Sequence, residues 1–156
     1  MTLTRDAGAG PNEPESDAEI SNPLEFHVGY QLRRASAAIL SRLASLLSDL
    51  KLTISEASVL VLVDDHPGIT QSALGRALGI HRANMAPLAA ILTERGLIER
   101  SQPGSRSIGL KTTKLGREQA MRARQCMEAN EDALLPALAP DQRAALIDLL
   151  KQIWQV

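Results

Sequence analysis

Residues 70–113 constrain the fold of this chain more than any other segment. Two short apolar stretches meet at Gly79, and a basic stretch with a Pro-Gly pair follows them. Leu74 and Leu78 give the first stretch an i, i+4 apolar stripe, and Thr70 offers a capping hydroxyl at its start. Glycine reaches the left-handed backbone region that a tight turn between helices needs. This order of parts predicts a winged helix-turn-helix.

The second helix of the pair is the candidate reader of DNA bases. Met85, Leu88 and Leu92 recur at steps of three and four on its buried side, and the small Gly75 lets it cross close to the first helix. Four polar side chains are then expected to face outward: His81, Arg82, Asn84 and Arg95. For Arg82 and Asn84 the alternative is that they are ordinary solvated residues, which an Arg-x-Asn pattern on an isolated helix would favour. Their place after a glycine-turned helix pair favours a DNA contact. Pro87 predicts a slight kink or, alternatively, a shortened helix.

Chemistry supports the first half of this helix as the reader. Arginine presents a planar fork of donors that suits guanine O6 and N7, and asparagine can pair with adenine N6 and N7, so Arg82 and Asn84 fit these roles. His81 lies where a helix cap would be, and we expect it to be solvated or to touch a phosphate. The predicted DNA-binding residues are Thr70, Gln71, His81, Arg82, Asn84, Met85 and Arg106.

The basic stretch predicts the wing. Residues 97–100 form a candidate strand, a turn follows at Pro103 and Gly104, and Ile108 and Leu110 alternate on a returning strand. Arginine at the tip of such a hairpin, here Arg106, can enter a narrow minor groove. A solvated hairpin arginine is the alternative.

The quoted residues resemble a known family. The stretch LGIHRANMAPLAAILTERGLIER, with its basic turn and the threonine-started TTKLGREQA, is similar to the MarR (multiple antibiotic resistance regulator) family of bacterial transcription factors over about residues 24–154. The resemblance implies a mainly α fold with a small β wing, long N- and C-terminal dimerisation helices, and a homodimer on double-stranded DNA. The family usually carries Asp two residues before the wing arginine, where this chain has Gly104. We therefore expect the recognition helix to supply more of the affinity.

Charge is distributed unevenly along the chain. The net charge is −1 over 156 residues, yet residues 70–117 hold eight Lys and Arg against two Glu, a local net charge of +6. Residues 1–25 carry a net charge of −5. A local cationic patch attracts phosphates and makes affinity fall with salt, whatever the global balance.

The whole sequence divides into four predicted parts. Residues 1–21 read as a disordered acidic tail, 22–52 as an N-terminal dimerisation helix, 53–112 as the DNA-binding lobe and 113–156 as C-terminal dimerisation helices. Within them, Asn22 and Pro23 predict a helix start.

Local signals also bear on the helices around the reader. Thr53 and Glu56 make a capping box that predicts a helix for ASVLVLVDDH, although VLVLV alone favours a strand. The helix from Thr113 to about Leu135 has Leu115, Met127 and Leu134 among its apolar positions. The last helix, from Asp141, has apolar side chains on one side: Leu146, Leu149, Leu150, Ile153 and Trp154. Such a side needs a partner surface, and we predict a two-fold dimer built by the first helix with the last two. A two-fold dimer would bind a pseudopalindrome.

Ligand and metal chemistry are weakly marked. The resemblance implies an effector such as a small aromatic or lipophilic acid, bound between the dimer helices and the DNA-reading lobe. His27, Tyr30, Arg33 and Arg34 are candidates because a cation beside a ring suits an anionic aromatic molecule, while a solvated or dimer-rim face is the alternative. The single Cys126 reads as a buried small hydrophobe rather than a redox sensor. We expect no metal, no cofactor and a cytoplasmic location.

Three function classes compete. A ligand-responsive DNA-binding repressor agrees with the cationic reader. A winged helix used for protein contacts would present an apolar or acidic face instead. An enzyme would need a nucleophile with a base, or paired carboxylates in a cleft, and neither is visible in the sequence.

Overall fold

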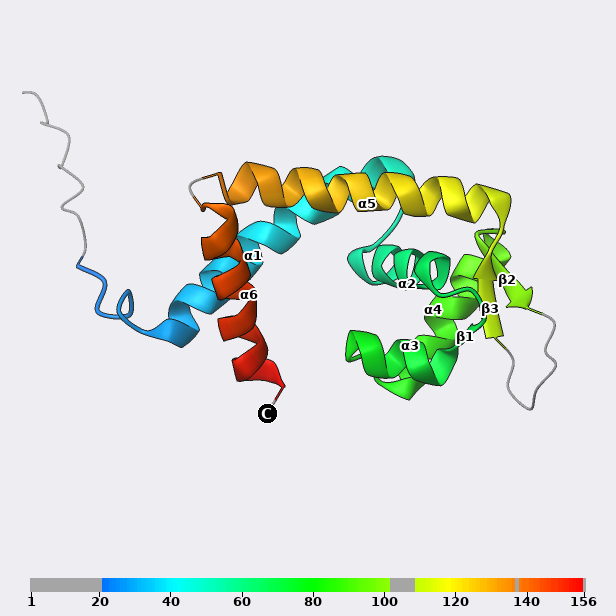
Figure 1. Ribbon diagram of the computed structural model, residues 1–156, viewed down its shortest axis with the longest axis horizontal. Coiled ribbons are helices and arrows are strands. Elements are labelled where there is room, and N and C mark those ends of the chain that lie inside the picture. The colour runs from blue at the N-terminus through cyan, green and yellow to red at the C-terminus, as the bar shows by residue number, and fades with distance from the viewer. Residues whose placement is uncertain (1–20, 102–108, 137, 156) are drawn as a thin grey trace, which may run out of the picture.

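The computed structural model describes residues 21–101, 109–136 and 138–155 (Figure 1). The predicted acidic tail, apart from Ser21, and the wing tip with Arg106 lie outside the described residues. The elements are α1 Val28–Leu47, η1 Ser48–Leu50, α2 Ile54–Asp65, β1 Ile69–Thr70, α3 Gln71–Leu78, α4 Arg82–Glu94, β2 Ile98–Ser101, β3 Gly109–Thr112, α5 Lys114–Leu134 and α6 Pro140–Trp154.

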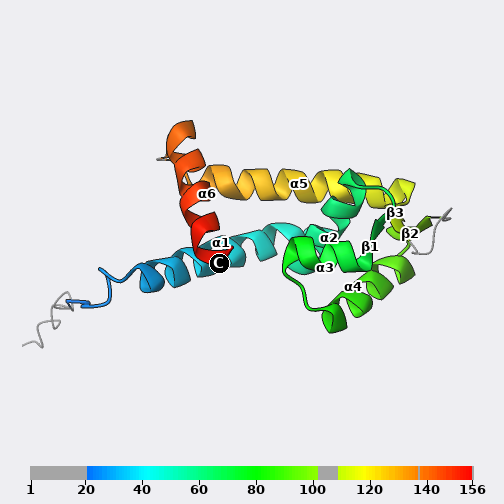
Figure 2. The same cartoon turned by 60° about the horizontal axis from the view of Figure 1, so that its bottom comes forward.

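Two long helices and a compact lobe make up the described chain. Helices α1 and α5 run side by side, and α2, α3, α4 and the sheet form the lobe at one end of α5 (Figures 1 and 2). Helix α6 follows the other end of α5 and is steeply inclined to it (Figures 1 and 2). The fold is therefore mainly helical with a small sheet, as expected.

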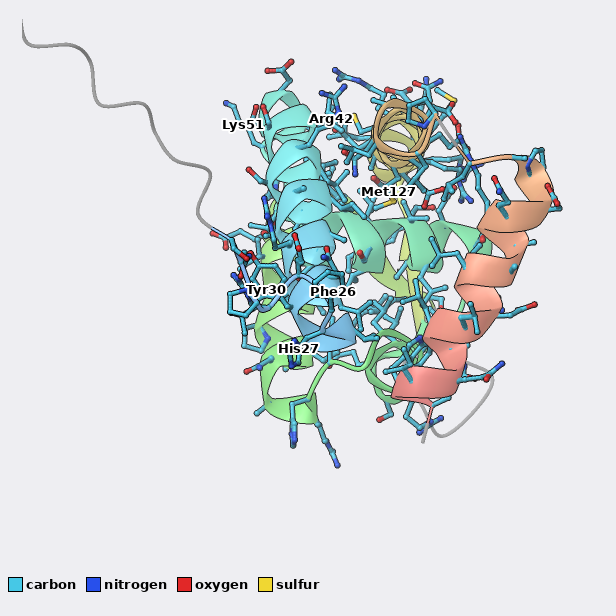
Figure 3. The ribbon with its side chains drawn as sticks, turned by 90° about the vertical axis from the view of Figure 1, so that its left-hand side faces the viewer. Phe26, His27, Tyr30, Arg42, Lys51 and Met127 are labelled. Atoms are coloured by element: carbon cyan, nitrogen blue, oxygen red, sulfur yellow. The ribbon has the colours of Figure 1, made fainter. Side chains whose placement is uncertain are left out.

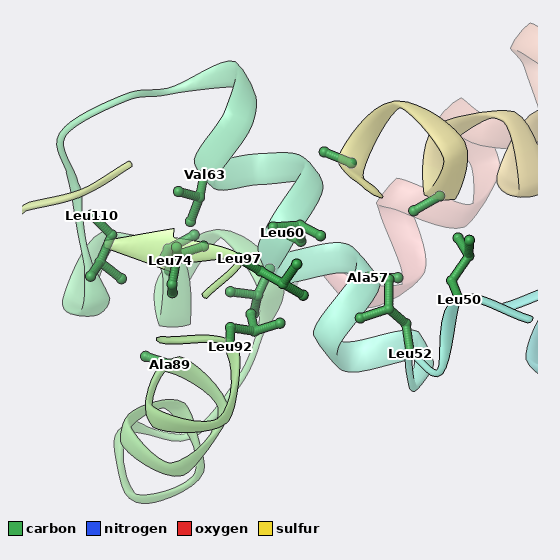
Figure 4. Close-up of a cluster of buried hydrophobic side chains, with 14 of the residues drawn as sticks. Leu50, Leu52, Ala57, Leu60, Val63, Leu74, Ala89, Leu92, Leu97 and Leu110 are labelled. Atoms are coloured by element: carbon green, nitrogen blue, oxygen red, sulfur yellow. The ribbon is translucent and has the colours of Figure 1, made fainter. Parts of the chain in front are cut away.

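The core lies inside the lobe and continues between α1 and α5 (Figure 4). Its largest fully buried apolar side chains are Leu47, Val59, Leu60, Val63, Leu74, Met85, Leu92 and Ile98. Helix α2 contributes three of these because it packs against α1, α3, α4, α5 and β3 at once. Burial around its whole circumference explains the strand-like sequence VLVLV, and the expected helix is confirmed.

Three helix starts follow the local capping chemistry. The Thr53 hydroxyl accepts from the Glu56 amide at 3.2 Å while the Glu56 carboxylate accepts from the Thr53 amide at 2.7 Å, which confirms the capping box. The hydroxyl of Thr70 caps α3 and that of Thr113 caps α5. Each of these satisfies an amide that the first turn leaves unpaired.

The expected start of the first helix at Asn22 and Pro23 is wrong. The Asn22 side-chain oxygen accepts from the Leu24 amide at 3.0 Å, so the residues after it form an isolated turn. His27 is extended and α1 begins only at Val28. Since Leu24 and Phe26 are exposed, no buried contact stabilises helix over the turn.

Strand β1 was not expected from the sequence. It pairs with β3 through Ile69 opposite Leu110, and β2 pairs with the other side of β3 through Ile98 opposite Thr112. The order β1-β3-β2 makes β3 the central strand. This pairing joins the start of α3 to the base of the wing.

The apolar positions expected on α5 are confirmed only in part: Met127 packs against the core. Leu115 is half exposed, and the positions that pack inward are Gly116, Ala120, Ala123 and Asn130. Small residues let α5 lie close to α1 and α2. Helix α6 has no buried residue, so its apolar side is open to solvent in the single chain.

Candidate nucleic-acid interface

The turn between α3 and α4 is built around two glycines. Gly79 ends α3 with a φ of 63°, in the left-handed region. The Ile80 amide then donates to the Gly75 carbonyl at 2.9 Å, and a Cβ at Gly75 would come within 2.9 Å of the Ile80 carbonyl oxygen. Gly75 is therefore required by the turn itself rather than by the crossing of the second helix.

The first turn of α4 is open to solvent. His81 is its N-cap residue without a side-chain capping bond, and Arg82 and Asn84 are exposed. The helix continues unbroken through Pro87 to Glu94, so Pro87 does not shorten it. The exposed N-terminal half thus projects from the lobe as a helix that is supported from behind by Met85, Ala89 and Leu92.

The structure brings several predicted residues together. A cleft between α3 and α4 is lined by Gln71, Ser72, Gly75, Arg76, Ile80, Arg82, Met85 and Ala86. In the part of the chain that the structure describes, neither Arg76 nor Arg82 forms an ion pair. Both guanidinium groups are available for an anionic partner such as a phosphate.

Ser72 and Arg76 were missed as site residues. Their spacing of four residues places both on one side of α3, next to Gln71, and this signal could have been read from the sequence. The predicted Thr70 is half-buried and its hydroxyl accepts from the Ala73 amide at 3.2 Å, so it orients α3.

Two expectations for α4 need correction. Met85 is 1% exposed and packs in the core, so its predicted DNA contact is replaced by a supporting role under the helix. Arg95 does not face outward: its guanidinium donates to the carbonyls of Lys51 at 2.8 Å and Leu50 at 3.2 Å. Leu50 ends η1 and Lys51, its C-cap residue, adopts a left-handed conformation. A cationic side chain satisfies carbonyls that a helix end leaves unpaired.

The wing is described only at its base. Glu99 lies opposite Lys111 in the β2–β3 pair, and their side chains form an ion pair of 3.1 Å. This pair is exposed and neutralises one cation of the segment. Arg106, Gly104 and Pro103 lie outside the described residues.

Three of the four predicted effector residues, Tyr30, Arg33 and Arg34, form a cluster at the start of α1. Figure 3 labels Tyr30 there. The guanidinium carbons of Arg33 and Arg34 lie 5.3 Å and 5.8 Å from the centre of the Tyr30 ring. The Asn22 amide donates to the Tyr30 hydroxyl oxygen at 2.7 Å and Arg34 donates to it at 3.5 Å. Hydrogen bonding from Asn22, then from Arg34, lowers the pKa of Tyr30. His27 lies exposed beside this cluster.

A second cleft lies between α2 and α5, the region where the family resemblance implied an effector site, but its lining residues were not among those named from the sequence. Its lining residues are Asp64, Lys114, Arg117, Glu118, Met121 and Arg124. The steps of three, four and three from Lys114 to Arg124 could have revealed this face of α5. Arg124 is paired with Asp65 at 3.0 Å, whereas Lys114 and Arg117 form no ion pair within the described residues. The carboxylates of Asp64 and Glu118 line the same cleft.

Other ligand chemistry is sparse. The described segments contain no cluster of His, Cys, Asp and Glu that could hold a metal ion. Cys126 is half-buried and its thiol lies 3.5 Å from the Leu46 carbonyl oxygen. Of the helices described, none is long and apolar enough to cross a membrane.

Comparison with known proteins gives a consistent set of relatives. The model of the MarR family matches residues 52–105. The transcriptional repressor CouR, bound to a 23-mer DNA duplex, is 34% identical with a TM-score of 0.73, over 81% of this chain and 91% of that chain. CouR bound to p-coumaroyl-CoA is also 34% identical, with a TM-score of 0.71, over 81% of this chain and 90% of that chain. A putative transcriptional regulatory protein for the hcr operon of Thauera aromatica is 28% identical over 139 residues, 87% of this chain and 84% of that protein.

A cleft-forming helix pair beside a β2–β3 hairpin, in a three-stranded sheet, defines the winged helix-turn-helix class of DNA-binding regulators. The chain belongs to the MarR family of transcriptional regulators.

Proposed function

We propose that this protein is a dimeric repressor that binds a pseudopalindromic operator and is released by an aromatic acid or its coenzyme A thioester. The observation that carries the proposal is the exposed first turn of α4, which presents Arg82 and Asn84 to solvent. Arg82 also lines the α3–α4 cleft together with Gln71 and Arg76. In a helix-turn-helix, residues at this end of the second helix meet base edges in the major groove. The first helix then lies across the phosphates, which suits Gln71 and Arg76.

Dimerisation is supported by the exposed apolar surface. Ile147, Leu149, Ile153 and Trp154 on α6 are all more than half exposed, and Phe26 near α1 is 86% exposed. Apolar side chains gathered in this way in a small protein mark an interface. We assign residues 22–52 and 113–156 to dimerisation and 53–112 to DNA binding, acting in the cytoplasm.

The effector is proposed from the relatives and from the charge of the clefts. CouR is bound to p-coumaroyl-CoA. A MarR family protein of Mycobacterium tuberculosis is in complex with p-aminosalicylic acid. That protein is 27% identical with a TM-score of 0.64, over 81% of this chain and 97% of that chain. The α2–α5 cleft lies between a dimerisation helix and the DNA lobe, and Lys114 and Arg117 there suit a carboxylate or phosphate. The Tyr30 cluster is the alternative site. Binding that favours one spacing of the two lobes releases the operator.

DNA binding is tested with an operator selected from a pool of random duplexes. The affinity of the protein for this operator and for unrelated duplexes is measured by fluorescence anisotropy at fixed salt. Arg82→Ala is expected to reduce discrimination between the two by about 1–3 kcal/mol. Arg122→Ala, an exposed arginine on α5, is the matched control and leaves discrimination unchanged. If the random pool yields no preferred sequence, or if Arg82→Ala discriminates as well as the unchanged protein, the assignment of Arg82 as a base-reading residue is wrong.

The effector is tested on the same complex. Aromatic acids and their coenzyme A thioesters are added, and release of the labelled operator is recorded. Arg117→Ala is expected to raise the concentration needed for release if the α2–α5 cleft binds the anion. If Arg117→Ala needs the same effector concentration for release and Tyr30→Phe needs a higher one, the effector binds at the α1 cluster instead.

A further inference from the structure

The outermost line of the recognition helix carries carbon rather than polar groups. In the first two turns of α4, five side chains are exposed: Arg82, Ala83, Asn84, Ala86 and Pro87. At about 100° of rotation per residue, Ala83 and Pro87 lie about 40° apart. The midpoint between them is opposite Met85, which is 1% exposed. Ala83 and Pro87 therefore form the ridge that points most directly away from the core.

Polar residues flank this ridge on both sides. Arg82 lies toward α3, because it lines the α3–α4 cleft together with Ala86 and Gln71. Asn84 lies about 100° from Ala83 on the opposite side. A surface that approaches α4 along its outward normal meets the ridge first, and meets the two hydrogen-bonding side chains at its edges.

The chemistry of the ridge limits what it can recognise. Neither alanine nor proline has a side-chain donor or acceptor, so neither can bond to a base edge. In the major groove the one apolar group that a base pair presents is the C5-methyl of thymine, and small apolar side chains contact it. A protein partner would need a large buried anchor such as Trp, Tyr or Arg at the centre of the surface, whereas this centre holds only small side chains. The cations Arg76 and Arg82 at its edge favour a duplex.

Resting on the DNA binding proposed above, we infer that Ala83 and Pro87 are specificity-determining residues that contact thymine methyl groups. Each operator half-site then carries thymine at the positions facing the ridge. These positions lie between the guanine read by Arg82 and the adenine read by Asn84. The methyl contact selects thymine over cytosine and over purines at positions where the helix makes no hydrogen bond.

The test replaces each thymine of the selected operator, one at a time, by deoxyuridine. This change removes the C5-methyl and leaves base pairing unaltered. We expect uracil to weaken binding by about fourfold at one or two positions in each half-site, the ratio for losing contact with one methylene-sized group. At all other thymines the ratio of the two affinities is expected to stay near one.

Protein variants then assign each position. Ala83→Gly is expected to bring the thymine-to-uracil ratio to one at its own position and to leave the other position unchanged, while Pro87→Ala lowers the ratio at the other. Ala77→Gly, an exposed alanine on α3 outside the α3–α4 cleft, is the matched control. Because each ratio compares two duplexes with one protein sample, a loss of folded protein cancels.

The outcomes separate the two proposals. If uracil binds as well as thymine at every position while Arg82 still discriminates guanine, the inference about the ridge is wrong and the proposed function stands. If a sensitive position keeps its full ratio in both Ala83→Gly and Pro87→Ala, the methyl is read by another residue and the inference is also wrong. If no duplex is preferred, the proposed function itself fails.

Discussion

Gly116 on α5 provides a sharp test of how this long helix is joined to the lobe. Its position next to the carbonyl group of Leu97 leaves no space for a Cβ atom, and the obstacle is backbone that cannot rotate away. The same junction is held by the Thr113 amide, which donates to the Leu97 carbonyl at 3.1 Å, and by the Thr113 hydroxyl, which donates to the Gly96 carbonyl at 2.7 Å. Gly116→Ala therefore forces α5 away from Leu97, the residue before β2.

The expected magnitude follows from three contributions. Overpacking against backbone costs about 3 kcal/mol, the upper part of its usual range. Weakening one hydrogen bond of Thr113 costs about 1 kcal/mol. Replacing glycine by alanine inside a helix returns about 1 kcal/mol of helix propensity. The net loss in the free energy of unfolding is about 3 kcal/mol, which lowers Tm by about 6–12 °C for a chain of this length.

Thermal unfolding followed by circular dichroism measures this change, at equal protein concentrations because dimerisation shifts Tm. Gly29→Ala is the matched control: Gly29 also lies in a helix, and a Cβ there would meet nothing within 4 Å. It is expected to raise the free energy of unfolding by up to about 1 kcal/mol. A rise in Tm for Gly116→Ala similar to that for Gly29→Ala would refute the close approach of α5 to Leu97.

Two further predictions concern α6 and the start of α1. Leu149→Glu places a charge on the apolar side of α6 and is expected to give a monomer by light scattering, with affinity for the operator lost. Gln152→Glu on the polar side should remain dimeric, and a dimer in both variants would place the interface elsewhere. For the single tyrosine, Tyr30, we expect a tyrosinate absorbance titration with a midpoint below 10.0, and Asn22→Ala should raise it. Because the pKa of Tyr30 is lowered in the folded state, the tyrosinate adds folding stability near and above pH 10, and this contribution is lost as the pH falls through the lowered pKa. A titration midpoint that Asn22→Ala does not move would show that the Asn22 hydrogen bond is not the main cause of the lowered pKa.

Much of the helix-turn-helix could be predicted because its signals are local. The capping hydroxyls of Thr53, Thr70 and Thr113 act within one turn of the residue that carries them. Gly79 stops α3 through its own backbone angles. The exposed position of Arg82 and Asn84 follows from helical periodicity once Met85 and its neighbours are assigned to the core.

The missed features depend on partners that are distant in the sequence. Arg95 binds carbonyls 44 and 45 residues earlier in the chain, so helical periodicity could not show that its guanidinium turns back toward η1. Strand β1 exists only because β3, forty residues later, pairs with it. The failed start at Asn22 has the same origin, since a correct capping residue was present and no tertiary contact supported a helix there.

The amino-acid sequence by itself determined where α3 and α4 begin, where α3 ends, and that Arg82 and Asn84 are exposed on the first turn of α4. These properties rest on interactions that span about one helical turn. Only the tertiary structure decided that small residues of α5 form the contact with the lobe, that Arg95 turns back toward η1, and that Gly116 lies against Leu97. Close packing between segments far apart in the chain depends on the shapes of both surfaces, and the sequence of either segment alone does not contain the other.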